Sequence, residues 1–322
     1  MVDTLWKQKN KNGFISYTSD HHGKTVTGLA PDLNNRWQVM RELLGPEWRW
    51  YDEKYSEIEY KIDKNGFRNS IEPEDIEEGY ILQAGQSVVE CIGLPWEDTS
   101  TQKIMDATGK QVYQVAVSGI DVPTIRDNII AALKTMPKPS HIIVWLTNLK
   151  SEMMTYHRAG TDDYFNVMPL YGKIKEFMVK KYGINNDWMT QALDVHRACT
   201  RGSNFHEQLH WQAVKHIEDI CSILDIPLTV CDCEMDNRIF DKDAEIGVTL
   251  DGHWVRFMNL FPVGDEMDKL LSLNEMQDLA LIEQYPIEWL NTRARDLVHN
   301  GPEASALCVE HLVERINRCL KP

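Results

Sequence analysis

The amino-acid sequence predicts an α/β fold in which a parallel sheet is covered by helices on both faces. From about residue 76 onward, short apolar runs alternate with segments of helical periodicity, which is the pattern of successive strands and crossover helices. The chain has 322 residues, of which 43% are hydrophobic and 26% charged, as is typical of a soluble globular protein. This length accommodates one large domain with additions, or two small domains.

Four strands and at least four helices are expected after residue 76. The strands lie at 80–84, 111–117, 141–148 and 226–233. One helix is expected through residues 87–94 or soon after them, and the others lie at 122–136, 205–225 and about 302–320. On one face of the helix at 122–136, the apolar residues are Ile125, Ile129, Ile130 and Leu133. Along the expected buried side of the last helix, they are Leu307, Val309, Leu312, Val313 and Ile316.

The first 75 residues have a different composition from the rest of the chain. Residues 1–75 are polar and aromatic with many turn signals, and we expect an amino-terminal extension packed on a main domain of residues 76–322. Within the extension, a helix is expected at 35–44, and a strand leading into a loop is expected in 57–69.

A second irregular stretch interrupts the main domain. Residues 234–290 are long for a connection, so we expect an insertion that forms a lid or an added subdomain. Within it, His253 and Trp254 are candidates for contact with substrate because of their position in a lid.

Charge and hydropathy exclude some classes of partner. The formal net charge is −15, from 34 basic and 49 acidic side chains, and an acidic surface repels phosphate backbones. We therefore expect no nucleic-acid partner. The amino terminus lacks the apolar core of a signal peptide, and no stretch approaches the length of a membrane span. The expected location is the cytoplasm, without membrane association.

The cysteines indicate neither a disulfide framework nor a zinc ribbon. Their count of seven is odd, and their spacing lacks paired C-x-x-C motifs. Free buried thiols are the expected state. The cysteines are Cys91, Cys199, Cys221, Cys231, Cys233, Cys308 and Cys319.

Candidate catalytic residues stand where the expected strands end. Ser87 follows the first strand on a Gly-Gln-Ser turn, Gly119 follows the second strand, and Asn148 ends the third. Asp296 and His299 lie just before the last helix. In open α/β sheets, ligands bind beyond the carboxyl ends of the strands, so these residues are expected at one rim.

In this order, the serine, glycine, asparagine and Asp-x-x-His resemble the blocks of the SGNH, or GDSL-type, hydrolase superfamily. The resemblance covers residues 76–322 apart from the insertion, and the segment NGFRN at 65–69 is similar to one found in many such esterases. It implies a three-layer α/β/α sandwich with a flavodoxin-like sheet. The implied activity is that of a serine hydrolase acting on carboxylic esters, without a metal or organic cofactor.

The resemblance also implies a role for each candidate residue. Ser87 is the nucleophile, His299 is the base, and Asp296 orients the base. The backbone N–H groups of Ser87 and Gly119 and the side chain of Asn148 form the oxyanion hole. These residue types suit the chemistry, because a serine hydroxyl needs an imidazole to take its proton and the carboxylate stabilises the imidazolium. The expected substrate is a small-molecule or glycan ester, with removal of acetyl from a carbohydrate preferred.

Three positions depart from the pattern of the superfamily. The usual aspartate of Gly-Asp-Ser is replaced by Gln86, which lies outside the catalytic triad. The glycine and aspartate that usually flank the asparagine of the third block are replaced by Leu146 and Leu149.

A zinc metalloprotease is an alternative interpretation. His206, Glu207 and His210 match the H-E-x-x-H motif, in which two histidines one turn apart bind zinc and the glutamate acts as base. However, a third ligand at His216 would require the helix to break, and Ala213 stands where a glycine is usual. Partly exposed histidines on a crossover helix are the favoured interpretation. Its expected core stripe is Leu209, Ala213, Ile217, Ile220 and Leu224.

A non-catalytic binding protein on the same scaffold is a further alternative. The altered residues beside Asn148 favour it, whereas the presence of all the expected site residues argues against it.

Overall fold

The computed structural model describes residues 6–29, 34–146, 153–158, 161–166, 187, 191, 194, 205–232, 254–256, 287–291, 294–295 and 301–319. Its centre is a five-stranded sheet in the order β11-β10-β7-β5-β6, and every pairing in it is parallel. The strands are β5 (Ile81–Gly85), β6 (Val112–Ala116), β7 (His141–Leu146), β10 (Leu228–Asp232) and β11 (Trp254–Arg256). Counted along the chain, the order is 2-1-3-4-5, so the predicted flavodoxin-like sheet is confirmed.

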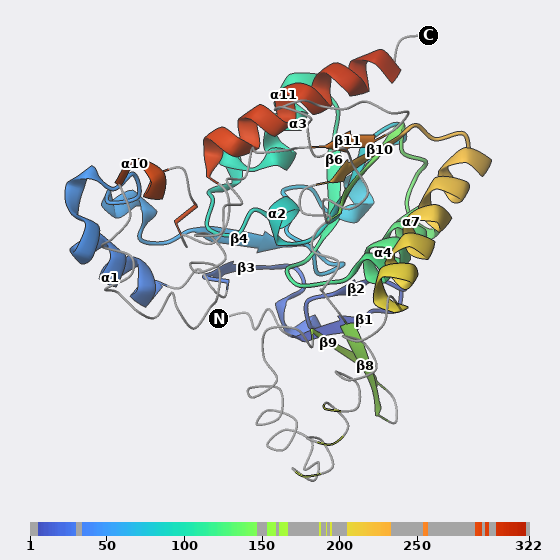
Figure 1. Ribbon diagram of the computed structural model, residues 1–322, viewed down its shortest axis with the longest axis horizontal. Coiled ribbons are helices and arrows are strands. Elements are labelled where there is room, and N and C mark those ends of the chain that lie inside the picture. Colours follow the sequence, from blue (N-terminus) through green and yellow to red (C-terminus); the bar gives the residue numbers. More distant parts are fainter. Residues whose placement is uncertain are drawn as a thin grey trace.

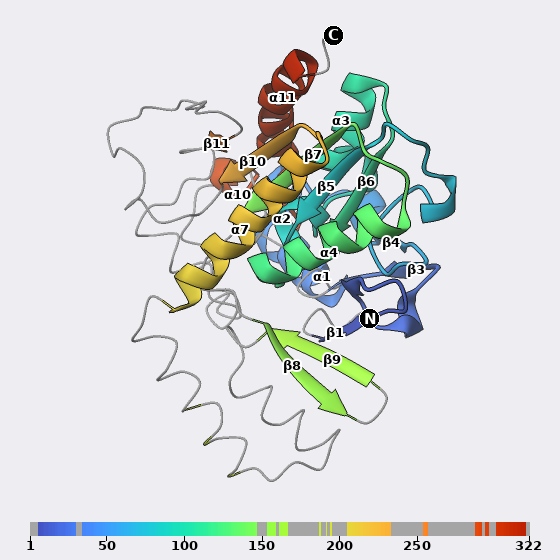
Figure 2. The ribbon, with the colours of Figure 1, turned by 90° about the vertical axis from the view of Figure 1, so that its right-hand side faces the viewer.

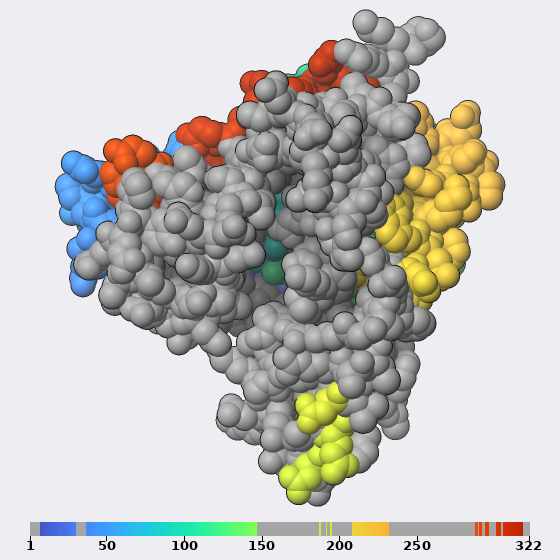
Figure 3. Space-filling model, viewed as in Figure 1, coloured from blue at the N-terminus to red at the C-terminus, as the bar shows by residue number. Residues whose placement is uncertain are grey.

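Helices cover both faces of this sheet. On one face α4 (Val122–Thr135) packs beside α7 (Phe205–Ile223), and on the other α3 (Ser100–Thr108) packs beside α11 (Pro302–Cys319), as Figure 1 and Figure 2 show. The predicted three-layer α/β/α sandwich is therefore confirmed. In the space-filling view, α11 and α7 lie at the surface along two edges of the molecule (Figure 3).

The central strands are buried on both faces because alternate side chains enter two separate cores. Leu82, Val115 and Val144 belong to the cluster that includes the apolar sides of α4 and α7. Ile81, Val112 and Ile143 belong to the cluster that includes the apolar sides of α3 and α11. Such strands read as apolar runs in the sequence, which is why these three were predicted within one or two residues of their bounds.

Two leucines predicted in buried helix stripes are exposed. Leu307 is 40% exposed, and Cys308 takes its place on the face shared with Leu312 and Ile316. Cys308 lies four residues before Leu312 and eight before Ile316, so these three side chains share one face of the helix. Leu307 is one residue away from Cys308 and therefore points away from that face. Leu224 is 42% exposed because α7 ends at Ile223.

The amino-terminal region contributes one small sheet, two strands of a second small sheet, and a helix. β3 (Lys24–Thr27) pairs with β4 (Glu59–Ile62), and α1 spans Asn34–Leu44. The second small sheet has the order β2-β1-β9-β8. Its strands are β1 (Trp6–Lys9), β2 (Ile15–Ser16), β8 (Met153–Arg158) and β9 (Thr161–Asn166). The remaining short helices are α2 (Ser87–Glu90), α10 (Ile287–Leu290), η1 (Ser19–His21), η2 (Gly45–Glu47), η3 (Glu53–Tyr55), η4 (Pro73–Asp75) and η5 (Trp96–Asp98).

Side chains of this region share the main core. Phe14, Tyr60 and Phe67 lie in the same buried cluster as Leu82 and Val115 of the central sheet. The amino-terminal region therefore packs on the sheet through apolar contacts, while the boundary at residue 75 stays a prediction.

The stretch expected to be an insertion supplies part of the central sheet. β11 lies within residues 234–290 and pairs in parallel with β10, with Trp254 opposite Val230. The backbone of Trp254 thus belongs to the edge strand, whereas His253 lies outside the described residues. A lid formed by the remainder of this stretch stays a prediction.

The described residues also bear on the cysteines and on membrane insertion. Cys91, Cys221, Cys231 and Cys308 are free and buried, as expected of reduced core thiols. Among the helices in the described part of the chain, none combines the length and apolar character that crossing a bilayer requires.

His141 makes the stability of this fold dependent on pH. Its side chain is fully buried at the start of β7, with Nε2 2.8 Å from Thr229 Oγ1. Burial, with a smaller contribution from Arg315, lowers the pKa of His141 to about 4. The unfolded chain takes up the proton near pH 6.5, so stability is complete above about 6.5 and is lost as the pH falls toward 4.

We expect the free energy of unfolding to fall by about 2 kcal/mol between pH 7 and pH 5 from this residue. Urea unfolding of wild type and His141→Gln at both pH values measures the effect, which the variant should lack. The exposed His216→Gln serves as the matched control and should keep the wild-type difference. Equal pH dependence in His141→Gln and wild type would contradict the assignment.

Candidate active site

Ser87 stands at the carboxyl end of the central strand β5. It is the first residue of α2 and is half-buried, with Gln86 between it and the strand. β5 pairs with β6 on one side and β7 on the other, so the chain order reverses at this strand. In sheets of this topology the rim at the reversal is the usual place for a ligand.

The turn that carries Ser87 is tight and requires the glycine before it. A Cβ added to Gly85 would lie 2.5 Å from Val89 Cγ2 and 3.1 Å from Trp145 Cβ. The first turn of α2 therefore packs directly on the strand backbone, which a larger side chain would prevent. This strand-to-helix geometry presents the first helical residue at the end of the sheet.

Gln86 joins the Ser87 turn to the neighbouring loop. Its side chain is buried, and its amide Nε2 donates a hydrogen bond to the carbonyl of Ile120. Its backbone carbonyl accepts the N–H groups of Val89 and Glu90, each at 3.0 Å. The residue that departs from the Gly-Asp-Ser pattern is thus a link between two loops of the candidate site.

Gly119 lies in the turn after β6, beside the Ser87 turn. Its φ of +74° is a left-handed conformation that favours glycine. The preceding amide, Ser118 N–H, donates to Oε2 of Glu90 at 2.7 Å. Asp121 then caps α4 by accepting from Thr124 N–H at 2.9 Å. β5 and β6 pair in parallel, so the turns that carry Ser87 and Gly119 follow neighbouring strand ends, while the catalytic roles of the two residues stay predictions.

Glu90, at the end of α2, was not among the residues predicted from the sequence. It is fully buried, and its Oε1 accepts a hydrogen bond from the Tyr17 hydroxyl at 2.5 Å. Burial raises the pKa of Glu90, while the hydrogen bonds from Tyr17 and Ser118 and the charges of Arg68 and Lys7 oppose that rise. Burial and the adjacent carboxylate raise the pKa of Tyr17 well above its usual value, so the phenol keeps its proton.

Arg68, in the NGFRN segment, holds the chain that follows Ser87. Its fully buried guanidinium donates to the carbonyls of Glu90 at 3.0 Å, Cys91 at 2.7 Å and Leu94 at 2.7 Å. It also lies 4.4 Å from the ring centroid of Tyr60. The last carbonyl groups of a helix have no hydrogen-bond donor within the helix. The Arg68 guanidinium is the donor for the carbonyls at the end of α2.

Asn69, in the same segment, completes the edge of the central sheet. Its amide Nδ2 donates to the carbonyl of Gln114, and its Oδ1 accepts from the Gln114 N–H, both at 3.0 Å. Because β6 is the edge strand, Asn69 replaces the backbone of a missing neighbour there.

The other predicted site residues lie outside the described residues, namely Asn148, Asp296 and His299. Two residues close to them in sequence, Leu146 and Arg295, are described. Leu146 ends β7, which pairs with β5. Arg295 is buried, and its N–H donates to the carbonyl of Gly93 at 3.1 Å. The residue before Asp296 is therefore held against the turn that follows α2.

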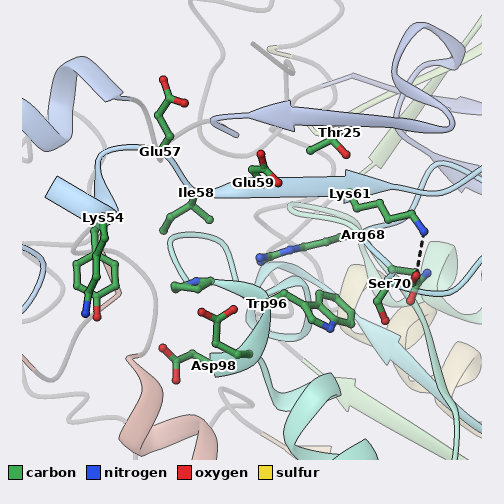
Figure 4. Close-up of a pocket in the computed structure, with 14 residues that line it drawn as sticks. Thr25, Lys54, Glu57, Ile58, Glu59, Lys61, Arg68, Ser70, Trp96 and Asp98 are labelled. Carbon is green, nitrogen blue, oxygen red and sulfur yellow. Dashed lines mark hydrogen bonds between the residues drawn. The ribbon is translucent and has the colours of Figure 1, made fainter. Parts of the chain in front are cut away.

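A cavity of about 570 Å³ lies between the antiparallel strand pair β3–β4 and the loop after α2. Glu57, Glu59 and Lys61 line it from the side of β4, and Trp96 lines it from the loop, as Figure 4 shows. Arg68 lines it as well, so the cavity and the Ser87 turn share one anchoring side chain.

The zinc-protease motif lies on α7, which is continuous from Phe205 to Ile223. His210 is 1% exposed, so the prediction of a partly exposed histidine is wrong there. It shares the core face with Ala213 and Ile217, three and seven residues on, which explains its burial. His216 is exposed, as expected for a residue turned away from His210 in an unbroken helix. The side chains of His206 and Glu207 lie outside the described residues, among which no metal-binding cluster of three is present.

Comparison with known proteins shows a distant similarity to a solved structure. No family model matches the chain, and no curated protein matches it. Among solved structures, the chain is similar to AlinE4, an esterase of the SGNH-hydrolase family, at 15% identity and a TM-score of 0.27. The match covers 52% of this chain and 65% of that chain, under two thirds of its length. A similarity at this level carries no argument about family, so the fold rests on the strand order described above.

Proposed function

We propose that the chain is a serine hydrolase of SGNH type that cleaves carboxylic esters through an acyl-enzyme. The observation that carries the proposal is the joining of the Ser87 and Gly119 turns at the point where the strand order reverses. Gln86 bonds the carbonyl of Ile120, and Glu90 bonds the N–H of Ser118, so two contacts link these turns.

In the proposed reaction, Ser87 Oγ attacks the ester carbonyl and His299 accepts its proton. The oxygen of the tetrahedral intermediate is stabilised by the N–H groups of Ser87 and Gly119 and by the Asn148 side chain. His299 then returns the proton to the departing alcohol, and Asp296 keeps the imidazole in the required tautomer. Water hydrolyses the acyl-enzyme by the same steps, releasing the acid and restoring Ser87.

Two anchoring contacts support the remaining assignments. Arg295 is bonded to Gly93, which puts the chain entering Asp296 close to the turn after Ser87. β7 pairs with β5, so Leu146, two residues before Asn148, ends a strand that neighbours the Ser87 strand.

The proposed substrate is a small-molecule or glycan ester, with acetyl on a carbohydrate preferred. The reaction as written needs no metal or organic cofactor, and we propose action in the cytoplasm. A binding protein without catalysis is the alternative, and the following labelling experiment separates the two.

A fluorophosphonate should add to the folded protein once, at Ser87, with loss of fluoride. The reason is that only a serine whose proton is taken by a neighbouring base reacts at a useful rate. Intact mass followed by peptide mapping measures the adduct. His299→Ala should not be labelled, nor should the unfolded wild type. An adduct at another serine, or none on folded wild type, would contradict the acyl-enzyme mechanism.

A further inference from the structure

Glu90 connects three distant parts of the chain within the buried interior. It ends the helix that Ser87 begins, and its two carboxylate oxygens have different partners. Oε2 accepts from Ser118 N–H at 2.7 Å, and Oε1 accepts from the Tyr17 hydroxyl at 2.5 Å. A buried carboxylate is costly in free energy unless hydrogen bonds and opposite charges compensate it. The two hydrogen bonds of Glu90 are therefore a specific feature of the structure.

We propose that Glu90 is a positioning residue, held by Tyr17, that fixes the Ser118–Gly119 turn in register with the Ser87 nucleophile. The inference rests on the proposed function, because it assigns a purpose to the turn that carries the oxyanion donor. Glu90 itself does not touch the substrate in this proposal.

The turn needs such a constraint because of its glycine. Gly119 adopts a φ of +74°, and a glycine can leave this conformation at little steric cost. An oxyanion donor is effective only when it is oriented before the reaction begins. Bonding the preceding N–H, that of Ser118, to a carboxylate on the Ser87 helix makes the nucleophile and the turn one unit.

Tyr17 constrains Glu90 in turn. Its phenol stays protonated and donates to Oε1, which leaves Oε2 to face Ser118. Tyr17 is fully buried in the core shared with Val117 and Ile120, the residues on either side of Ser118 and Gly119. The amino-terminal region thus supplies the final support of the turn.

The test measures kcat and KM on p-nitrophenyl acetate for Glu90→Ala, Glu90→Gln and Tyr17→Phe. Glu90→Ala removes the acceptor of Ser118 N–H, and we expect kcat to fall about tenfold to a hundredfold with KM unchanged. Glu90→Gln keeps an acceptor oxygen, and Tyr17 can accept from its amide, so this variant should recover most of kcat. Tyr17→Phe should lower kcat about threefold to tenfold, because Glu90 loses one of its two constraints.

Asn128→Ala is the matched control. Asn128 is buried and makes two hydrogen bonds to Ile15, at 2.7 and 3.0 Å, so its loss also loosens the amino-terminal region. We expect it to lower the melting temperature as Glu90→Ala does, while kcat stays within about twofold of wild type.

A wild-type kcat in Glu90→Ala, or a kcat in Glu90→Gln as low as in Glu90→Ala, overturns the inference. If Glu90→Ala does not fold, Tyr17→Phe decides, and an unchanged kcat in that variant overturns it. Failure of the proposed function has a different result, which is full turnover in Ser87→Ala or no adduct on Ser87 in wild type.

Discussion

Ser87→Ala is expected to lower the turnover of p-nitrophenyl acetate by about 10⁵-fold to 10⁶-fold, to a level near that of the oxyanion hole and binding alone. The substitution removes the oxygen that forms the acyl-enzyme in the proposed mechanism, and residue 87 is half-buried, so we expect an alanine to fit without strain. Steady-state rates and the melting temperature, measured on the same preparation, separate loss of chemistry from loss of fold.

The matched control for this variant is Ser222→Ala, an exposed serine near the end of α7. It should keep the wild-type rate, which shows that the assay responds to residue 87 rather than to the loss of a hydroxyl in general. Turnover in Ser87→Ala within tenfold of wild type, with an intact fold, would mean that the reaction occurs elsewhere.

Asp296→Asn is expected to lower turnover by about 10⁴-fold while the fold is kept. In the proposed mechanism, an asparagine amide would hold the imidazole of His299 in the wrong tautomer, so that the nitrogen that serves Ser87 would carry a proton and could not accept another. His299→Ala should lose a similar amount, and Ser87→Ala combined with it should lose little more, because the three residues act as one unit. Steady-state rates of the two single variants and the double variant measure this.

The pH dependence of turnover provides the control for this second experiment. In wild type, turnover should fall on the acid side, because a protonated His299 cannot take the Ser87 proton. Asp296→Asn should retain residual turnover with a different pH dependence. Losses from Ser87→Ala and His299→Ala that simply multiply in the double variant would argue against a shared mechanism.

The strands and helices with strong patterns could be predicted from the sequence. β5, β6 and β7 are buried on both faces and so appear as apolar runs, and α4, α7 and α11 have long amphipathic periods. The helix expected through 87–94 or soon after is two helices, α2 and α3, and the bounds of α3 were not predicted because it buries few apolar side chains, with Ile104 the main one. β11 has three residues and was missed because nothing in so short a segment separates a strand from a loop.

The candidate site could be predicted only where its residues follow strand ends. Ser87 and Gly119 satisfy this condition, because neighbouring parallel strands bring their carboxyl ends together. Glu90 and Tyr17 are 73 residues apart and meet through tertiary packing, so no local pattern indicates their hydrogen bond. The NGFRN segment was noticed as a resemblance, but the three carbonyls that Arg68 bonds could be known only from the structure.

The contact between Asn128 and Ile15 joins residues 113 apart in sequence, which has a consequence for the newly made chain. At ribosomal rates of about 5–20 residues per second, the segment around Ile15 waits on the order of ten seconds before its partner is synthesised. During that time Phe14 and Tyr17, both fully buried in the finished fold, lack the part of their core that α4 supplies through Ile125, Ile129 and Ala132. The amino-terminal region therefore completes its packing only after α4 has been made.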